Sequence, residues 1–312
     1  MTELLKETNF KNLGRKFTGK VRDVYEQDGR LILITTDRHS SFDRLIAHIP
    51  HKGQVLNEIS AFWFEETKDI VPNHVLAIPD PNVTAGKKCK PLPVEAVVRG
   101  YMTGVTDTSL WTHYQKGKRD FGNFKLPDGM KKNQQLLRPV FTPSTKSDAH
   151  DRTLSPQEIV NEGILPRKTI DAIESAALAL YERGAKIARE QGLILVDTKY
   201  EFGTLNGSDD IILIDEIHTP DSSRYWQLDS YEGRFAQGEE PEYFDKEFLR
   251  LWFKEHSDPY KDEKLPEAPP ELVEELSKRY IRMYEQITGS TFKPGKEPIL
   301  ARIERNLKAY AA

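Results

Sequence analysis

Two short apolar runs near the middle of the chain constrain its fold more than any other feature. The runs are Leu193–Val196 and Ile211–Ile214, and residues 206–210 between them read Asn-Gly-Ser-Asp-Asp. Asn and Gly favour the tight turns that join antiparallel strands, and the runs themselves are aliphatic and rich in β-branched residues. The sequence therefore predicts a β-hairpin around which the rest of the chain is arranged.

Charged residues alternate along the end of the first predicted strand. Strand residues two apart share a face, so Asp197, Lys199 and Glu201 point to one side. Asp215 closes the second run, and if it lies opposite Lys199, its carboxylate is a diagonal neighbour of Glu201. Two carboxylates and an ammonium at strand ends suit a magnesium ion with phosphate oxygens. The alternation alone favours a ladder of ion pairs on a solvated face, but residues 219–224 add an arginine and hydrogen-bonding groups directly beyond.

Two segments of this central region resemble those of a known enzyme family. Residues 195–203 read Leu-Val-Asp-Thr-Lys-Tyr-Glu-Phe-Gly, and residues 215–224 read Asp-Glu-Ile-His-Thr-Pro-Asp-Ser-Ser-Arg. Both closely resemble the hallmark segments of SAICAR synthetases (phosphoribosylaminoimidazole-succinocarboxamide synthases), and the matching motifs span residues 19–224. We assign catalysis to Lys199, Glu201 and Asp215, and the metal to Glu201 and Asp215. We assign substrate binding in this region to Asp221, Ser223 and Arg224.

Composition narrows the class of protein. The chain has 312 residues, of which 38% are hydrophobic and 30% charged, typical of a soluble globular protein with a substantial core. Its net charge of −4 argues against a general nucleic-acid binder. The single cysteine, Cys89, excludes an internal disulfide and favours a reducing compartment. Without a signal peptide or membrane-spanning window in the sequence, we expect a cytoplasmic protein that binds neither nucleic acid nor membrane.

A glycine and two cations near the N-terminus form the first of the further motifs. Residues 19–25 read Gly-Lys-Val-Arg-Asp-Val-Tyr and alternate as a strand does, which puts Lys20 and Arg22 on one face. Beside a glycine, two such cations can hold a polyphosphate, although the pattern alone favours an ordinary exposed strand edge. The motif is similar to the nucleotide loop of the family, which lies over the ATP phosphates. The resemblance implies ATP contacts from Gly19, Lys20, Val21 and Arg22.

A polar segment follows the next predicted strand, at residues 36–43. The family has a similar Asp-Arg-x-Ser-x-Tyr/Phe-Asp segment near its substrate, so we expect Ser41 and Asp43 to help shape the pocket. His39 in the same segment is expected to make a structural hydrogen bond.

Residues 91–104 form the second strong match. Strand alternation places Glu95 and Arg99 on one face, with glycines after the arginine that leave room for a carboxylate or phosphate. A structural Glu95–Arg99 ion pair is the alternative. The resemblance implies that Arg99 contacts the imidazole nucleotide, and we assign Glu95 to the ATP site and Thr103 to the substrate site. One departure is that a familiar version ends Thr-Gly-Ser where this chain has Val105, so a hydroxyl contact must come from Thr106, Thr108 or Ser109, or be absent.

The third match reads Phe-Thr-Pro-Ser-Thr-Lys at residues 141–146. A loop broken by proline, with scattered polar residues, is the alternative interpretation. Beside the neighbouring matches, we expect Lys146, His150 and Asp151 to help hold acidic substrates.

The predicted elements indicate an α+β fold without regular βαβ alternation. Helices are predicted at residues 54–67, 170–190, 245–256, 270–287 and 298–310, and a surface loop at 115–135. The resemblance implies a two-lobed architecture of the ATP-grasp or kinase-like type, with nucleotide between the lobes. We divide the chain into an antiparallel β-rich nucleotide lobe (1–91), a larger α+β catalytic lobe with the hairpin (92–230) and C-terminal helices packed on the body (231–312).

The resemblance also implies a reaction. SAICAR synthetases use ATP and Mg²⁺ to join L-aspartate to the carboxylate of carboxyaminoimidazole ribonucleotide (CAIR). A kinase of small phosphorylated metabolites shares the architecture and the acid pair, and a nucleotide-binding regulator without turnover is a third possibility. The sequence leaves open whether the protein is a monomer or a homodimer, and which residues hold L-aspartate.

Overall fold

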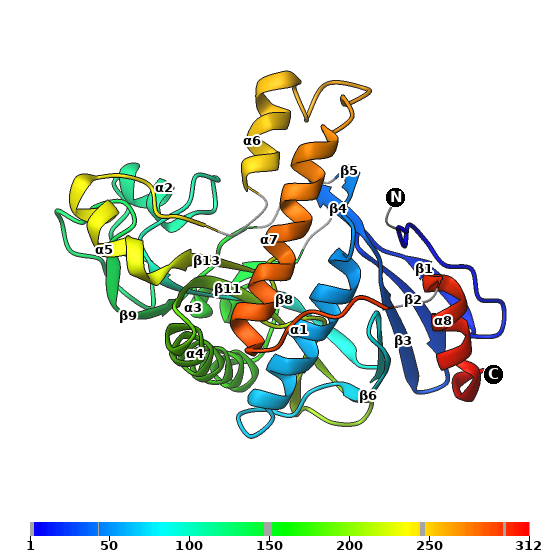
Figure 1. Cartoon of the computed structure of the whole chain (residues 1–312). Helices are drawn as coiled ribbons and strands as arrows, with labels where there is room; N and C mark the ends of the chain where they lie inside the picture. Colours follow the sequence, from blue (N-terminus) through cyan, green and yellow to red (C-terminus); the bar gives the residue numbers. More distant parts are fainter. Residues whose placement is uncertain (1–2, 43, 147–151, 244–246, 296–297, 312) are drawn as a thin grey trace.

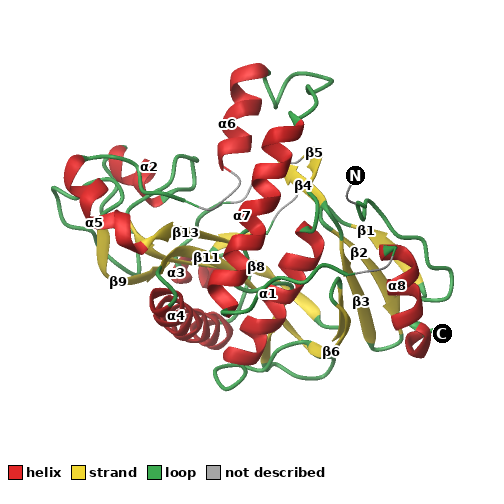
Figure 2. Cartoon of the chain, viewed as in Figure 1, coloured by secondary structure: helices red, strands yellow, loops and turns green. Residues whose placement is uncertain are grey.

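Two large antiparallel sheets and a set of helices make up an α+β structure (Figure 1, Figure 2). The computed structural model describes residues 3–42, 44–146, 152–243, 247–295 and 298–311. Asp43, His150 and Asp151, which the sequence assigns to the substrate site, therefore lie outside the described residues. The predicted α+β class is confirmed, while the division at residues 91 and 230 stays a prediction.

The first sheet has the strand order β1-β2-β3-β7-β6. Its strands are β1 (Arg15–Thr18), β2 (Arg22–Gln27), β3 (Arg30–Thr35), β6 (Val75–Asp80) and β7 (Val83–Lys87). A small pair, β4 (Arg38–Ser41) and β5 (Arg44–His48), follows β3. One face of the sheet buries aliphatic side chains against helix α8 (Ile299–Asn306). These side chains form a hydrophobic core separate from the main one, and Ile303 of α8 is fully buried in it. The C-terminus thus returns to the N-terminal sheet (Figure 1).

The turn between β1 and β2 corrects one prediction. The alternation over residues 19–25 predicts a strand from Gly19, but the strand begins at Arg22, and Gly19, Lys20 and Val21 form the turn. The backbone N–H of Gly19 donates to the carbonyl of Arg22 (2.8 Å), which closes the hairpin over these residues. The motif therefore presents backbone as well as side chains at a sheet edge.

The second sheet is built around one long strand, β11 (Leu193–Thr204). Its order is β10-β8-β11-β12, with β13 also pairing with β11 and β9 with β8. The partners are β8 (Lys90–Tyr101), β9 (Gln135–Phe141), β10 (Ser144–Thr145), β12 (Ile211–Ile214) and β13 (Ser223–Gln227). The predicted hairpin is confirmed as β11 and β12, and helix α4 (Arg167–Glu190) packs on this sheet with its apolar stripe buried.

The register of the hairpin differs from the one we expected. Glu201 pairs with Ile214, so Asp215 does not lie opposite Lys199, and the register on which the diagonal pairing with Glu201 depends is not formed. A shift of one residue exchanges the faces of a strand. Asp215 also has φ 69°, a left-handed conformation that ends β12 and redirects the chain. Its carboxylate reaches the neighbourhood of Glu201 because of this turn rather than by strand alternation.

Two helices that are distant in sequence lie side by side across the middle of the molecule (Figure 1). They are α1 (Lys52–Glu66) and α7 (Pro270–Thr288), and the predicted stripe of α7 is buried at Leu276, Tyr280 and Ile287. The remaining helices are α2 (Leu110–Gln115), α3 (Pro156–Asn161), α5 (Leu228–Gln237), α6 (Glu247–His256) and the 3₁₀ turn η1 (Lys308–Tyr310). Within the described ranges, no helix is long and apolar enough to cross a membrane.

The predicted surface loop at residues 115–135 contains more packing than its composition indicates. Phe121, Phe124 and Leu126 are buried there with Met102 and Leu110, and they form an apolar cluster of their own. The segment is nonetheless irregular, so the prediction of a loop holds for its backbone.

Candidate active site

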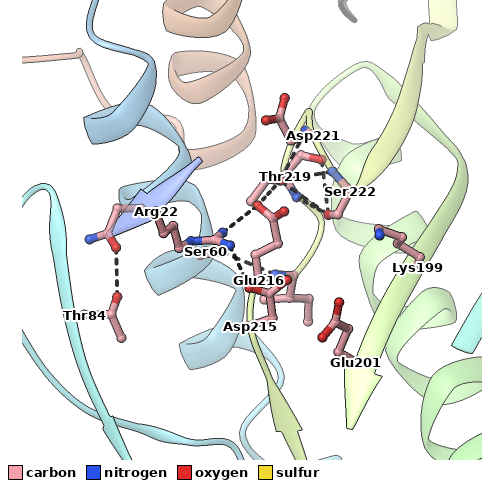
Figure 3. Close-up of polar contacts among 12 residues, drawn as sticks. Arg22, Ser60, Thr84, Lys199, Glu201, Asp215, Glu216, Thr219, Asp221 and Ser222 are labelled. Atoms are coloured by element: carbon pink, nitrogen blue, oxygen red, sulfur yellow. Dashed lines mark hydrogen bonds and ion pairs between the residues drawn. The ribbon is translucent and has the colours of Figure 1, made fainter. Parts of the chain in front are cut away.

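An arginine from the first sheet meets two carboxylates that follow β12 (Figure 3). Arg22 Nη1 lies 2.6 Å from Asp215 Oδ1, and Arg22 Nη2 lies 2.9 Å from Glu216 Oε2. Burial alone would lower the pKa of Arg22, but these carboxylates outweigh burial and raise the pKa above its ordinary value. The guanidinium therefore stays charged and links the nucleotide motif to the end of the central hairpin. Sequence reasoning missed Glu216, whose only signal was its place directly after Asp215.

The neighbouring strand positions contribute a lysine and a glutamate to the same space. Figure 3 shows Lys199 and Glu201 extending from β11 toward the segment that carries Asp215 and Glu216. Lys199 Nζ lies 2.7 Å from Glu95 Oε1. Burial would lower the pKa of Lys199, but the nearby carboxylates, Glu95 first, raise it above the usual range. Lys199 is therefore a permanent cation.

Glu201 has a separate partner on a third strand segment. Its Oε2 lies 2.5 Å from Lys146 Nζ, which follows β10. Glu95 and Glu201 are directly opposite in the ladder of β8 and β11, an arrangement that repels like charges unless cations stand beside them. Lys199 and Lys146 are those cations. The sequence assigns Lys146 to holding acidic substrates, and that role stays a prediction.

These side chains form what we call the carboxylate cluster. Its members are Arg22, Glu95, Lys146, Lys199, Glu201, Asp215 and Glu216. Three cations against four carboxylates leave one unit of negative charge. In the described part of the chain, no group of three or more His, Cys, Asp or Glu is arranged to hold a metal. Mg²⁺ commonly uses one or two carboxylates and takes its other ligands from phosphates and water, so Glu201 and Asp215 fit a magnesium ion that arrives with a nucleotide.

Arg38 holds the turn at residues 19–21 in place through hydrogen bonds to its backbone. Arg38 donates to the carbonyl oxygens of Gly19 (3.0 Å) and Lys20 (3.4 Å), and it pairs with the fully buried Asp23 (2.8 Å). A single guanidinium thus ties the turn to the sheet. Sequence reasoning placed Arg38 in a substrate-side motif and missed this contact, because the pairing depends on how β4 lies against the turn.

A second cluster, which we call the arginine cluster, consists of Arg99, Asp197 and Arg224. Asp197 pairs with Arg99 in the ladder to β8 and with Arg224 in the ladder to β13, so three adjacent strands align these side chains. Arg224 Nε lies 2.9 Å from Asp197 Oδ1 and its Nη2 contacts Oδ2, while Arg99 Nη1 lies 3.5 Å from Oδ2. The alternative Glu95–Arg99 pair is not formed, because Glu95 contacts Lys199 instead.

Burial and charge in the arginine cluster work against each other. Asp197 is 7% exposed, and burial alone would raise its pKa, but Arg224 and Arg99 lower the pKa below its ordinary value. Arg99 also donates to Thr142 Oγ1 (2.9 Å), which fixes the plane of its guanidinium. Two cations share one carboxylate, so the cluster carries surplus positive charge suited to an anion.

A serine hydroxyl lies beside this cluster, close in sequence to Val105. Val105 is exposed, whereas Ser109 is buried and its Oγ lies 2.8 Å from Thr106 Oγ1. Gly104 has φ +103°, and a Cβ there would lie 2.4 Å from Ser109 Oγ and 3.3 Å from Arg224 Nη1. Ser109 therefore faces the same space as Arg224, and glycine at 104 keeps that space open.

The other assigned substrate residues differ in what their side chains contact. Thr103 donates to Asn133 Oδ1 (2.7 Å) and Ser223 donates to Thr198 Oγ1 (2.8 Å), so both hydroxyls already hold the scaffold together. Asp221 lies on the turn beside Ser222, close to the carboxylate cluster (Figure 3). Ser41 Oγ is buried and has no hydrogen-bond partner within the described ranges, so a ligand or a residue outside them can supply one.

Comparisons with known proteins agree on one family. A family model described as SAICAR synthetase matches residues 15–267. The phosphoribosylaminoimidazole-succinocarboxamide synthase of Legionella pneumophila (strain Lens) is 56% identical over 301 residues, which cover 95% of this chain and 96% of the relative. A chloroplastic synthase of the same name from Arabidopsis thaliana is 55% identical over 313 residues, covering 98% of this chain and 76% of the relative.

Solved structures give the same result. The SAICAR synthase of Saccharomyces cerevisiae complexed with SAICAR superimposes with a TM-score of 0.80 at 32% identity, covering 93% of this chain and 100% of that one. A type-2 SAICAR synthetase in complex with ADP superimposes with a TM-score of 0.67 at 24% identity, covering 90% of this chain and 100% of that one, and supports the fold.

Proposed function

The chain belongs to the SAICAR synthetase family, and from this premise we propose how its residues carry out the ligase reaction of purine biosynthesis. The reaction joins L-aspartate to the carboxylate of CAIR, with ATP as the source of energy and Mg²⁺ as the metal. The observation that carries the proposal is the pattern of charge along β11. The arginine cluster, around Asp197 of this strand, has a surplus of positive charge. The carboxylate cluster, around Glu201 of the same strand, has a surplus of negative charge.

The chemistry explains why both kinds of site are needed. A carboxylate resists attack by an amine because it is anionic and its leaving group would be oxide. Transfer of the γ-phosphoryl group of ATP to a carboxylate oxygen of CAIR releases ADP and forms an acyl phosphate. The aspartate amine then attacks the carbonyl carbon, the bond to the phosphate oxygen breaks, and phosphate leaves as the amine proton is lost. All three reactants are anions, so positioning and charge neutralisation supply most of the acceleration.

The carboxylate cluster and the turn at residues 19–21 form the nucleotide end. The backbone of the turn and Lys20 face the phosphates of ATP, and Arg22 extends from the next position toward the acids. Glu201 and Asp215 would hold Mg²⁺, which neutralises phosphate charge and orients the transferring group. Lys199 places a permanent positive charge beside this group, held in position by Glu95. Lys146 neutralises Glu201 until the nucleotide arrives.

The arginine cluster forms the other end. Asp197 and Glu201 are four residues apart on β11, which separates their Cα atoms by roughly 13 Å. Arg99 and Arg224 there bind the phosphate of CAIR, with the Ser109 hydroxyl beside them, while Asp221 accepts from a substrate hydroxyl. CAIR in this position spans the distance between the two clusters and brings its reacting carboxylate to the metal.

One assay tests the proposal and separates it from its alternatives. Purified protein is incubated with ATP, Mg²⁺ and CAIR, with and without L-aspartate, and ADP and SAICAR are quantified. The proposal predicts SAICAR and matching ADP only when aspartate is present. Sustained ADP release without aspartate would indicate a small-metabolite kinase, and binding of ATP without turnover would indicate a regulator.

Location and assembly also belong to the proposal. A cytoplasmic location is supported by the single cysteine, Cys89, which is a free thiol. The net charge of −4 gives no support for nucleic acid as a partner. Either a monomer or a homodimer is compatible with the site, since both clusters are built from this chain alone.

A further inference from the structure

We infer that Tyr280 and Lys52 are positioning residues of the substrate site, which together orient the carboxylate of Asp221. Tyr280 lies on α7, far beyond the last of the sequence motifs, and Lys52 lies at the start of α1. The inference rests on the proposed function, because it assumes that Asp221 binds CAIR. It makes helix α7 part of the site as well as of the core.

The contacts at Asp221 occupy both of its carboxylate oxygens. Lys52 Nζ lies 2.7 Å from Asp221 Oδ2, and the Tyr280 hydroxyl donates to Oδ1 at 2.6 Å. Lys52 is 0% exposed and Tyr280 is 2% exposed, so water does not compete for these bonds. Two partners on different helices prevent rotation of the carboxylate. A carboxylate oxygen can accept more than one hydrogen bond, so these contacts are compatible with a bond to a ligand.

Helix α7 is docked firmly enough to place the tyrosine hydroxyl. Ser277, one turn before Tyr280, donates its hydroxyl to the carbonyl oxygen of Pro50 (2.7 Å), just before α1. Leu276, Met283 and Ile287 bury the same face of α7 in the main core. The ammonium of Lys52 lies 5.7 Å from the centre of the Tyr280 ring, so the two positioning residues also contact each other.

The turn that carries Asp221 is connected to the carboxylate cluster. The N–H of Asp221 donates to Thr219 Oγ1 (3.2 Å), and Thr219 Oγ1 donates to Glu216 Oε2 (2.7 Å). The backbone N–H of Lys199 donates to the carbonyl of Ser222 (3.2 Å). Asp221 therefore lies beside the carboxylate cluster. Lys52 on α1 and Tyr280 on α7 fix the orientation of its carboxylate.

Stability alone does not explain a buried lysine and aspartate. An apolar pair of similar volume stabilises a core as well as or better than a buried ion pair, because the charges must lose their water. A fixed carboxylate that faces a ligand explains the arrangement: the lysine supplies the opposite charge, and the tyrosine selects one orientation.

The test is Tyr280→Phe, which removes one hydroxyl and keeps the buried ring. A lost hydrogen bond to a charged group predicts a rise of about tenfold in the KM for CAIR, with the KM for ATP changed less than about twofold. Tyr284→Phe is the matched control, since it makes the same change one turn further along α7, and both KM values should stay at the wild-type level. Thermal unfolding of both variants checks that the fold is intact.

The possible outcomes separate this inference from the proposed function. Equal changes in both KM values, or no change in either, would overturn the role of Tyr280 while the ligase activity stands. Failure of the wild-type protein to form SAICAR would overturn the proposed function instead. In that case calorimetric titration with CAIR decides the inference: weaker binding to Tyr280→Phe supports it, and equal binding or no binding to either protein rejects it.

Discussion

The arginine cluster and the carboxylate cluster lie on one strand but differ in burial and in sign. Asp197 is 7% exposed and has partners on two neighbouring strands, and Arg99 is 9% exposed and contacts Asp197 and Thr142. In the carboxylate cluster the Asp215 side chain is 30% exposed and the Lys199 side chain 42%. The Arg99–Asp197 part of the first cluster is therefore buried and fixed before a ligand arrives, whereas the second cluster includes the partly exposed Asp215 and Lys199 and has charge left to neutralise.

This difference indicates how the two clusters function. A buried bidentate pair keeps its geometry without a ligand, which suits recognition of one substrate group. An open group of acids with lysine and arginine partners can exchange those partners for a metal and phosphates. Substitutions in the arginine cluster should therefore change stability and substrate affinity, and substitutions in the carboxylate cluster should change turnover.

The largest effect on stability is expected from Asp197→Asn. Removing this charge takes from the buried Arg99 the carboxylate that it contacts and breaks the bidentate contact of Arg224, which should lower the free energy of unfolding by about 3–5 kcal/mol. Urea unfolding at neutral pH measures the change, and Asp107→Asn, at a side chain that is 95% exposed, is the control. A decrease of less than about 1 kcal/mol in the free energy of unfolding would show that the arginine cluster stabilises the fold no more than an ion pair at the surface does.

The same residue predicts a pH dependence of stability. Folding lowers the pKa of Asp197, so its ionised form stabilises the folded state. This contribution to the unfolding free energy is complete above the ordinary pKa of an aspartate, and it is lost as the pH falls through the folded-state pKa. The difference in unfolding free energy between wild type and Asp197→Asn should therefore shrink in acid. A constant difference down to low pH would contradict an ionised Asp197.

The largest effect on turnover is expected from Glu201→Gln. It removes one of the two carboxylates assigned to Mg²⁺ and should lower kcat by about 10²–10³-fold, as loss of a transition-state electrostatic contact does. The unfolding free energy should change by less than about 1 kcal/mol, because the partner Lys146 is a surface lysine. Steady-state kinetics measure the effect, with Glu26→Gln, whose carboxylate pairs with Lys88, as the control. Full activity in Glu201→Gln would remove Glu201 from the mechanism.

A smaller effect, confined to one substrate, is expected from Arg99→Lys. A lysine keeps the charge but loses the planar fork, so the KM for CAIR should rise about tenfold or more and the KM for ATP about twofold or less. Arg167→Lys, on the exposed start of α4, is the matched control. If both KM values rise equally, the arginine cluster does not distinguish the two substrates.

The smallest effect is expected from Arg38→Lys, with the opposite preference. Lysine cannot replace the separate bonds to the carbonyls of Gly19 and Lys20, so the turn should loosen and the KM for ATP should rise about fivefold. The KM for CAIR should stay near the wild-type value. Arg30→Lys in β3 of the same sheet is the control. An effect of Arg38→Lys on CAIR alone would place Arg38 on the substrate side, as its motif suggests.

The sequence predicts the central hairpin because two aliphatic runs and a polar turn are local signals. It does not predict the register, because the polar turn between the runs is compatible with more than one pairing. Aspartate tolerates the left-handed conformation of Asp215 but does not require it. The arginine cluster depends on the alignment of three strands, so the sequence identifies Arg99 and Arg224 by motif but misses the carboxylate that joins them.

Residues distant in sequence are the hardest to predict. Tyr280 lies on an amphipathic stripe, and that pattern indicates packing, which is also correct. Its hydroxyl contact to Asp221 arises only once α7 lies beside α1. Lys52 is a buried charged residue, and its partner is Asp221 in the turn after β12. No residue near Lys52 in the sequence indicates this pairing.

The most direct test of the account is a crystal structure of the protein with ADP, Mg²⁺ and CAIR bound together. The account predicts a magnesium ion about 2.1 Å from carboxylate oxygens of both Glu201 and Asp215, with an anionic group of CAIR on Arg99 and Arg224. A metal bound away from these two acids, or an arginine cluster that contacts no part of CAIR, would contradict it.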